Sequence, residues 1–209
     1  MLDLPTLEGR RCTLRPLQER DAESLQRHAD DPAVAFNLFD GFPQPYTLEL
    51  ARTWCSSQHR EPAFAHVLGI TVPSDQVVGC ISVTPEHGIW RCSAVIGYWL
   101  GRRFWNQGIT SESLTLLSHW AWQALPNTTR LFMPIYARNG ASQRVAVKAG
   151  YRLEAHLPQA VQAGTETIDA VLYGAYRGSP LFRPDLAARL RAVDTALHGG
   201  EWPRPATAT

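Results

Sequence analysis

Residues 94–117 read AVIGYWLGRRFWNQGITSESLTLL, and this stretch decides the fold that we expect. AVIGYWL is apolar and has the length of one buried strand, while the apolar run over 111–124 has the length of a helix. A polar loop containing Gly108 joins the two. The first N–H groups of a helix lack internal partners, and the helix dipole places partial positive charge there. The stretch therefore predicts an anion site, suited to a pyrophosphate, at the start of this helix.

A glycine before a helix is also common in ordinary turns, so the loop alone is weak support for this site. The stretch has neither the GxGxxG pattern of dinucleotide-binding folds nor the GK[ST] of a P-loop. Arg102 and Arg103 add positive charge at the mouth of the loop. Further motifs elsewhere in the chain are needed to distinguish a phosphate site from an ordinary turn.

Apolar patterning on both sides of this stretch predicts alternating strands and helices in one domain of 209 residues. Phe36 to Tyr46 is rich in aromatic residues, Pro and Gly and is expected to be a loop, and Asp21 is expected to cap the first helix. The expected elements are strands at 12–17, 64–72, 77–84, 94–100, 130–137, 151–156 and 166–176, and helices at 21–30, 47–58, 111–124, 140–149 and 184–198.

Two motifs, in the expected order, give the chain a family resemblance. GYWL followed by WNQGIT and a helix resembles motif A of the GNAT acetyltransferases, written [QR]xxGx[GA]. ARNGASQRVAVKAGY, from residue 137, resembles motif B of the same family. The closest branch is the RimJ/RimL type, which acetylates the N-termini of ribosomal proteins. Trp105 and Thr110 depart from motif A, but a cradle made mainly of main-chain N–H groups tolerates both changes.

The resemblance implies a GNAT fold: an α/β (α+β) domain with a mixed, mostly antiparallel central sheet, a splay between the fourth and fifth strands, and helices on both faces. It covers about Leu7 to Tyr176, so we expect one domain over 1–180 and a C-terminal helix with a flexible tail over 181–209. It also implies an enzyme that moves an acetyl group from acetyl-CoA, as co-substrate, to a primary amine. The favoured acceptor is the α-amine of a protein or peptide N-terminus.

The resemblance also assigns the site residues. Ser142 is expected to assist departure of the thiolate, with Asn139 holding the pantetheine arm, and Phe36, Phe39 and Tyr46 are expected to roof the acceptor. The residues expected to bind acetyl-CoA are Tyr98, Trp99, Leu100, Arg103, Trp105, Asn106, Gln107, Gly108, Ile109, Thr110, Asn139 and Arg144. Helix capping is the alternative for Asn139 and Ser142, and local core packing is the alternative for the aromatic loop.

The general base is not fixed by the sequence. By the resemblance, Val161 occupies the position where some relatives have a Glu that acts as the general base. Ala146 occupies the position where many relatives have a Tyr that acts as the general acid, which leaves Ser142 as the candidate acid. The scattered candidates for a base are Glu86, His87, Glu112, Glu154, His156 and Asp169, and a water chain is a further route. Two other functions stay open: acetylation of a small-molecule amine, and a CoA-binding sensor without catalysis.

Net charge, cysteine spacing and the length of apolar runs bear on the partners, cofactors and location that we expect. The net charge is +1, which gives no sign of nucleic acid or an anionic membrane as partner. The four cysteines lack the spacing of a metal site, so we expect isolated reduced thiols and no metal. No apolar run reaches the ~18 residues of a membrane span, and we expect a cytoplasmic protein. The sequence leaves open whether two copies form a homodimer.

Overall fold

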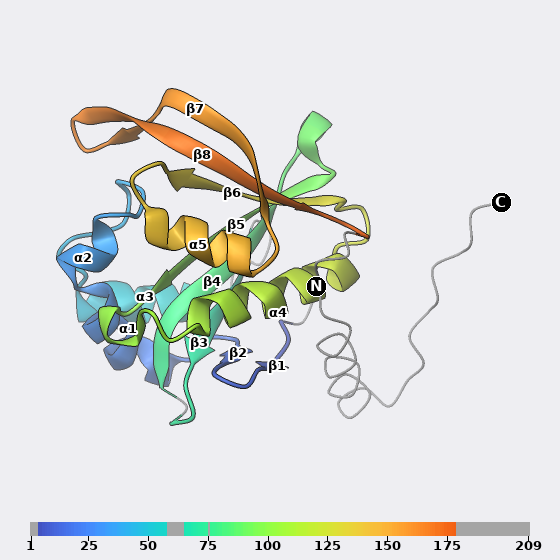
Figure 1. Ribbon diagram of the computed structural model, residues 1–209. Coiled ribbons are helices and arrows are strands. Elements are labelled where there is room, and N and C mark those ends of the chain that lie inside the picture. The colour runs from blue at the N-terminus through green and yellow to red at the C-terminus, as the bar shows by residue number, and fades with distance from the viewer. Residues whose placement is uncertain (1–3, 58–64, 75, 179–209) are drawn as a thin grey trace, which may run out of the picture.

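The computed structural model describes residues 4–57, 65–74 and 76–178. Within these ranges eight strands form one sheet in the order β1-β2-β3-β4-β5-β6-β8-β7 (Figure 1). All pairs of neighbouring strands are antiparallel except β5–β6, so the predicted mixed, mostly antiparallel sheet is confirmed. The strands are β1 (Leu7–Glu8), β2 (Thr13–Arg15), β3 (His66–Thr71), β4 (Val77–Pro85), β5 (Ser93–Leu100), β6 (Arg130–Tyr136), β7 (Arg152–Ala163) and β8 (Glu166–Tyr176).

Helices lie on both faces of the sheet, as predicted, and each face has its own core (Figure 1). The α-helices are α1 (Ala22–Ala29), α2 (Pro32–Ala35), α3 (Leu48–Ser57), α4 (Ile109–Ala124) and α5 (Gly140–Lys148). The larger core packs the sheet against α4 and α5, with fully buried Leu114 and Leu117 from α4. The smaller core packs the sheet against α1 and α3, with fully buried Leu25 and Ala51.

Strands β5 and β6 separate soon after they meet. They pair in parallel only from Ser93 to Val95 on β5 and from Arg130 to Phe132 on β6, although β5 continues to Leu100 and β6 to Tyr136. The second halves of the two strands therefore keep unpaired edges facing each other. This is the predicted splay between the fourth and fifth of the strands expected from the sequence.

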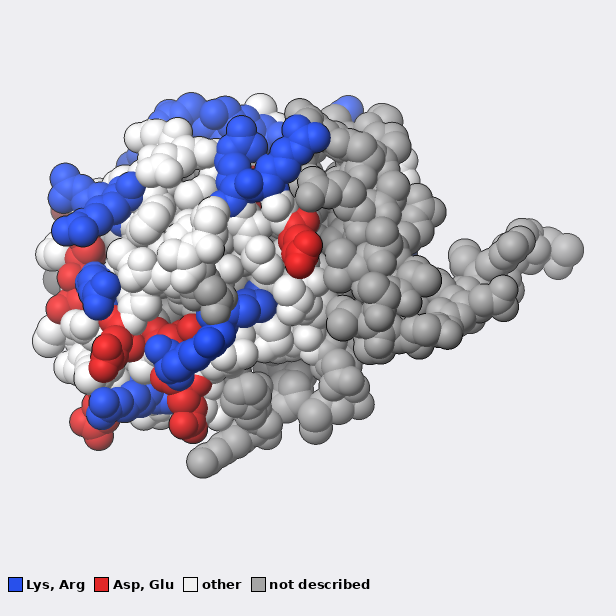
Figure 2. All heavy atoms as spheres, turned by 90° about the horizontal axis from the view of Figure 1, so that it is seen from below, with Lys and Arg blue, Asp and Glu red and all other residues white. Residues whose placement is uncertain are grey.

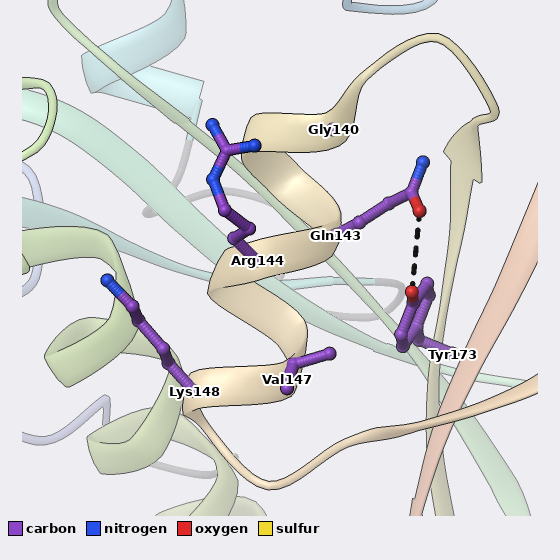
Figure 3. A pocket seen from close by; sticks show the side chains of 6 residues that line it. All are labelled: Gly140, Gln143, Arg144, Val147, Lys148 and Tyr173. Carbon is purple, nitrogen blue, oxygen red and sulfur yellow. Dashed lines mark hydrogen bonds between the residues drawn. The ribbon is translucent and has the colours of Figure 1, made fainter.

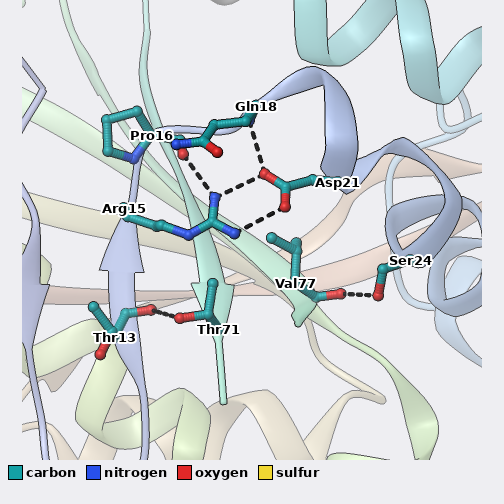
Figure 4. A network of polar contacts seen from close by, with 8 residues as sticks. All are labelled: Thr13, Arg15, Pro16, Gln18, Asp21, Ser24, Thr71 and Val77. Atoms are coloured by element: carbon teal, nitrogen blue, oxygen red, sulfur yellow. Dashed lines mark hydrogen bonds and ion pairs between the residues drawn. The ribbon is translucent and has the colours of Figure 1, made fainter. Parts of the chain in front are cut away.

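The start of α1 differs from the sequence prediction in its chemistry. Asp21 stands at the N-cap position, but its carboxylate does not cap the helix. It instead accepts hydrogen bonds from Arg15 Nη1 and Nη2, at 2.7 and 2.8 Å, and from the backbone N–H of Gln18 at 2.7 Å (Figure 4). Both charges are buried, so each is the partner that the other requires. The pair ties α1 to the end of β2.

Other elements also differ from the sequence prediction. The strand predicted at 151–156 extends to Ala163, because β7 and β8 form a long hairpin that needs no alternating apolar pattern where both strand faces are open. The short elements β1 and α2 were not predicted, and α4 begins two residues earlier than expected, at Ile109. The expected helix at 184–198 and the tail over 181–209 lie outside the described residues.

All four cysteines are free, as expected, and Cys12, Cys55 and Cys80 are buried as small apolar side chains. Over the ranges that the structure covers, no group of three His, Cys, Asp or Glu side chains is close enough to hold a metal ion. In the same ranges, no helix combines the length and apolar character needed to cross a membrane.

Candidate active site

The loop before α4 has the backbone shape of an anion cradle. Asn106 and Gly108 both adopt left-handed backbone conformations, with φ of 62° and 77°. Gly108 is the N-cap of α4, and its carbonyl accepts the N–H of Glu112 at 3.1 Å. The N–H groups before Glu112 therefore have no carbonyl partner within the helix. The left-handed turn at Gly108 and the free N–H groups that follow it suit the loop to hold a phosphate.

Two side-chain hydrogen bonds hold this loop, one to the end of β5 and one within the loop itself. Trp105 Nε1 donates to the Leu100 carbonyl at 2.7 Å, at the end of β5. Gln107 Nε2 donates to the Arg103 carbonyl at 2.9 Å. Trp105, which departs from the family pattern, thus has a clear structural role: its indole closes the loop over the strand end.

His28 supports the loop from below. Its ring is buried and meets Phe104 edge-on at 5.3 Å, and a Cβ placed on Gly101 would lie 2.9 Å from the ring. Nε2 of His28 has no hydrogen-bond partner among the described residues. Burial, with the nearby Arg27 and Arg103, lowers the pKa of His28, so the ring stays neutral. His28 was not among the site residues expected from the sequence.

Ser142 and Tyr98 meet across the splay. Asn139 Oδ1 accepts the N–H of Ser142 at 3.1 Å, so Asn139 caps α5. The Ser142 hydroxyl lies 2.6 Å from the Tyr98 hydroxyl, and Tyr98 comes from the separated half of β5. Burial raises the pKa of Tyr98 to about 12, although the hydrogen bond with Ser142 acts in the opposite direction. The phenol therefore stays protonated at neutral pH and can donate to the Ser142 oxygen.

A shallow pocket of about 440 Å³ lies beside α5 and is lined by Gly140, Gln143, Arg144, Val147, Lys148 and Tyr173 (Figure 3). Tyr173 donates to Gln143 Oε1 at 3.4 Å. Arg144 and Lys148, one helical turn apart, project from the opposite side of α5 (Figure 3). In the view from below, Lys and Arg side chains gather along the upper edge of the described part of the molecule (Figure 2). Such an edge suits an anionic ligand.

The loop over 36–42 is held against β6 and the β7–β8 turn by contacts between distant residues. Tyr136 donates its hydroxyl hydrogen to the Leu38 carbonyl at 3.2 Å. The Arg138 guanidinium lies 4.2 Å from the centre of the Phe36 ring, and its Nη2 donates to the Phe36 carbonyl at 3.0 Å. Asp40 accepts the N–H of Gly164 at 2.9 and 3.0 Å. These ties place the loop above the splayed strands.

The three aromatic residues expected to bind the acceptor lie in different environments. Phe36 is 60% exposed and Phe39 is 68% exposed, so both rings are accessible. Tyr46 is buried in the smaller core, where it stacks on Phe42 at 5.2 Å. Phe42 in turn contacts Trp99 of β5 at 6.1 Å. The burial of Tyr46 supports its packing role, and acceptor binding by this loop stays a prediction.

Part of the sheet face that carries α1 and α3 is not covered by a helix. Because side chains alternate along a strand, residues on β4, β5 and β6 that face away from the larger core share this side. Gly97 and Pro134 are exposed there. Ser82, Thr84, Val95, Phe132 and Tyr136 are neutral positions on this side, whereas Arg130, whose guanidinium lies 4.3 Å from the centre of the Phe132 ring, is charged and paired with Glu154. This side is therefore neutral around Gly97 and Pro134 and carries an Arg130–Glu154 ion pair at the start of β6.

Most candidate bases have structural partners. Glu112 accepts the N–H groups of Arg10 and Arg11, at 2.9 and 2.6 Å. Glu154 bonds to Arg130 and to the Tyr176 hydroxyl; burial opposes its ionisation, but these bonds outweigh it and lower the pKa of Glu154.

His156 and Asp169 are partners of each other and form a half-exposed pair on the β7–β8 hairpin, with Nε2 and Oδ2 3.1 Å apart. Glu86 and His87 lie at the β4–β5 turn, beside the start of β5 and not beside its splayed end. None of these groups is brought into contact with Ser142.

The structure thus combines a strand that separates from its neighbour, a helix start with free N–H groups and a hydroxyl pair across the splay, which is the arrangement that the family resemblance predicts. A family profile described as an acetyltransferase (GNAT) domain matches residues 11–152. The chain therefore belongs to the GNAT acetyltransferase family and is an acyltransferase enzyme.

Similar proteins agree with this assignment. The chain is 29% identical over 154 residues to the probable N-acetyltransferase YjcK of Bacillus subtilis (strain 168), covering 71% of this chain and 84% of that protein. The structure of Mycobacterium smegmatis RimJ in complex with CoA-disulfide superposes with a TM-score of 0.74 at 22% identity, over 91% of this chain and 95% of RimJ. RimL, the ribosomal L7/L12 alpha-N-protein acetyltransferase, in complex with coenzyme A, superposes with a TM-score of 0.71 at 23% identity, over 82% of this chain and 98% of RimL.

Proposed function

We propose that this enzyme transfers the acetyl group of acetyl-CoA to the α-amine of a peptide or protein N-terminus. The observation that carries the proposal is the Tyr98–Ser142 hydroxyl pair, which lies across the splay between β5 and β6. The RimL neighbour, by its description, acetylates a protein α-amine. The neutral side chains around Gly97 support an extended peptide better than a polycationic small molecule, which would call for free carboxylates, because the Glu154 carboxylate near this face is already paired with Arg130.

The residues present fit the donor. The cradle around Gly108 offers N–H groups for the pyrophosphate, and the unpaired edge of β5 offers backbone groups for the pantetheine arm. Arg103 and Arg144 supply positive charge, Arg103 beside the cradle and Arg144 at the start of α5. Bound there, acetyl-CoA supplies a thioester whose C–S bond breaks as the amine nitrogen bonds to the carbonyl carbon.

In this proposal Ser142 serves as the acid. The Tyr98 and Ser142 hydroxyls lie 2.6 Å apart and either can donate, so when Tyr98 is the donor the Ser142 hydrogen is free to point at the departing sulfur. A positioned hydroxyl can stabilise the developing thiolate and pass on a proton, an effect typically of ~10²–10⁴-fold in rate. Asn139 sets the direction of this hydroxyl by capping the helix that carries Ser142.

An α-amine acceptor can lose its proton without a strong general base. An α-amine has a pKa of ~8 and a lysine ~10.4, so a lysine costs about 3 kcal/mol more to deprotonate at neutral pH. Val161 stands where relatives have a Glu, and the chain brings none of the candidate carboxylates to Ser142. Water is therefore the proposed proton acceptor.

A thiol-release screen with acetyl-CoA tests the proposal against peptides with free N-termini and against small amines. Release with the peptides, and acetylated peptide as product, is the expected result. Faster release with polyamines or aminoglycosides would assign a small-molecule acceptor. Tight binding of CoA without release on any amine would contradict catalysis and favour a sensor.

A further inference from the structure

The turn between β1 and β2 is attached to the first turn of α4. The two oxygens of Glu112 accept the backbone N–H groups of Arg10 and Arg11. Gly9 makes this approach possible, since a Cβ on Gly9 would lie 2.9 Å from the Glu112 carboxyl carbon. The buried Cys12 adds a second attachment, with Sγ 3.3 Å from Ser113 Oγ. A segment from the start of the chain is thus fixed beside the anion cradle.

This attachment places the Arg11 side chain on the cradle itself. A Cβ built on Gly108 would lie 3.4 Å from Arg11 Nε, 3.6 Å from Cδ and 3.8 Å from Cζ. Arg11 is exposed, and its guanidinium has no carboxylate partner within the described residues. A guanidinium that is held in place but unpaired, next to free helix N–H groups, is suited to bidentate binding of a phosphate.

We propose that Arg11 binds the pyrophosphate of the donor and that Glu112 is the residue that positions it. The proposal rests on the donor site described under the proposed function. Arg11 lies against Gly108, the N-cap whose helix N–H groups would hold the pyrophosphate, so the pyrophosphate and not the 3′-phosphate is its partner. Glu112 therefore acts through two backbone N–H groups rather than as a base in the reaction.

Calorimetry with CoA and with 3′-dephospho-CoA tests the assignment. Arg11→Ala is expected to weaken the binding of both ligands equally, by ~10–100-fold, the size of a lost charge-assisted pair. Arg11→Lys is expected to recover part of the loss, since lysine keeps the charge but not the fork. Arg10→Ala is the matched control: it removes an arginine from the same turn but keeps the N–H to Glu112, and it is expected to bind as the wild type does.

Three results would overturn the assignment while leaving the donor site intact: unchanged binding by Arg11→Ala, a loss seen with CoA but not with 3′-dephospho-CoA, or an equal loss in Arg10→Ala. Wild-type protein that binds neither ligand would instead reject the donor site and this inference together. The two failures are thus distinguishable in one set of titrations.

The positioning role of Glu112 is tested by coupling. Glu112→Gln keeps one oxygen acceptor and is expected to weaken CoA binding less than Glu112→Ala does. Adding Glu112→Ala to the Arg11→Ala variant is expected to cause little further loss, because both changes remove the same contact. Losses that multiply in the double variant would show that Glu112 acts independently of Arg11 and would contradict positioning. A thermal unfolding curve on each variant separates these effects from loss of the fold.

Discussion

The donor half and the acceptor half of the site are built in opposite ways. On the donor side, Trp105 bonds to Leu100 five residues away, and Asn139 bonds to Ser142 three residues away. On the acceptor side, the loop over 36–42 is tied to residues 98 to 124 positions away in sequence. Local contacts shape the donor loop and the start of α5, to which Glu112 and Tyr98 add long-range contacts, whereas the ties of the acceptor loop all join residues far apart in sequence. The two halves should therefore respond separately to substitution.

The largest effect on the donor half is expected from a substitution at Gly108. Gly108→Asp should lower acetyl-CoA affinity at least ~100-fold, because a carboxylate repels the phosphates and the left-handed φ costs ~1–3 kcal/mol for a residue with a side chain. Calorimetry measures the effect.

Gly88→Asp is the matched control, since Gly88 also has a positive φ, of 60°, and no neighbour within 4 Å of a Cβ. Unchanged acetyl-CoA affinity in Gly108→Asp, or an equal loss in the control, would contradict the cradle.

Ser142 should affect rate without affecting binding. Ser142→Ala is expected to lower kcat by at least ~10-fold, since acid assistance is lost, and to leave acetyl-CoA affinity nearly unchanged. Ser142→Cys should recover little, because a thiol is a weak hydrogen-bond donor. Tyr98→Phe removes only the orienting bond and should lower kcat by roughly 5-fold. Full kcat in Ser142→Ala would make Ser142 a cap alone and leave water or Tyr173 as the acid.

Asp40 should affect the acceptor without affecting the donor. Asp40→Ala releases the loop over 36–42 from Gly164 and is expected to raise the peptide KM by about 5-fold, the effect of one or two hydrogen bonds. Asp40→Asn keeps an oxygen acceptor and should behave nearly as the wild type. A weakened acetyl-CoA affinity in Asp40→Ala would show that the two halves are not separable.

The smallest expected effect is a loss of stability at acid pH that depends on His28. Burial lowers the pKa of His28 beneath the donor loop, so the unfolded chain binds the proton more tightly than the folded protein does. Stability due to the neutral ring is then present above a pH of ~6.5 and is lost as the pH falls below it. His28→Phe, which keeps a ring against Phe104, should lose less thermal stability than wild type between neutral and acid pH. An equal loss in both proteins would contradict this.

The same contrast explains what the sequence could predict. The motifs around Gly108 and Asn139 predicted the loop before α4 and the start of α5, which depend on residues close together in sequence, and the family resemblance that they carry implied the splay. The start of α4 was placed two residues too late. Asp40 and Arg138 were missed, since nothing in the sequence near either residue marks its distant partner. Arg11 was missed for the same reason: it reaches Gly108 only after β1 and β2 have folded onto α4.

Asp21 shows that the sequence can predict a helix without predicting the partners of its side chains. The helix over 22–29 was predicted, but Arg15 binds the carboxylate that was expected to cap it. Propensity placed the helix correctly, and a buried charge pair then decided the role of its first side chain. Residue identity and spacing therefore predicted backbone structure better than side-chain partners.

The most direct test of the account uses one peptide with a free α-amine and one lysine, incubated with acetyl-CoA and the enzyme at neutral pH. Fragment-ion mass spectrometry then locates the acetyl group. Because Val161 replaces the family Glu, the proposal predicts acetylation of the α-amine, with little on the lysine, whose deprotonation costs about 3 kcal/mol more. Acetylation of the lysine at an equal or faster rate, or no acetylation of the peptide at all, would contradict the account.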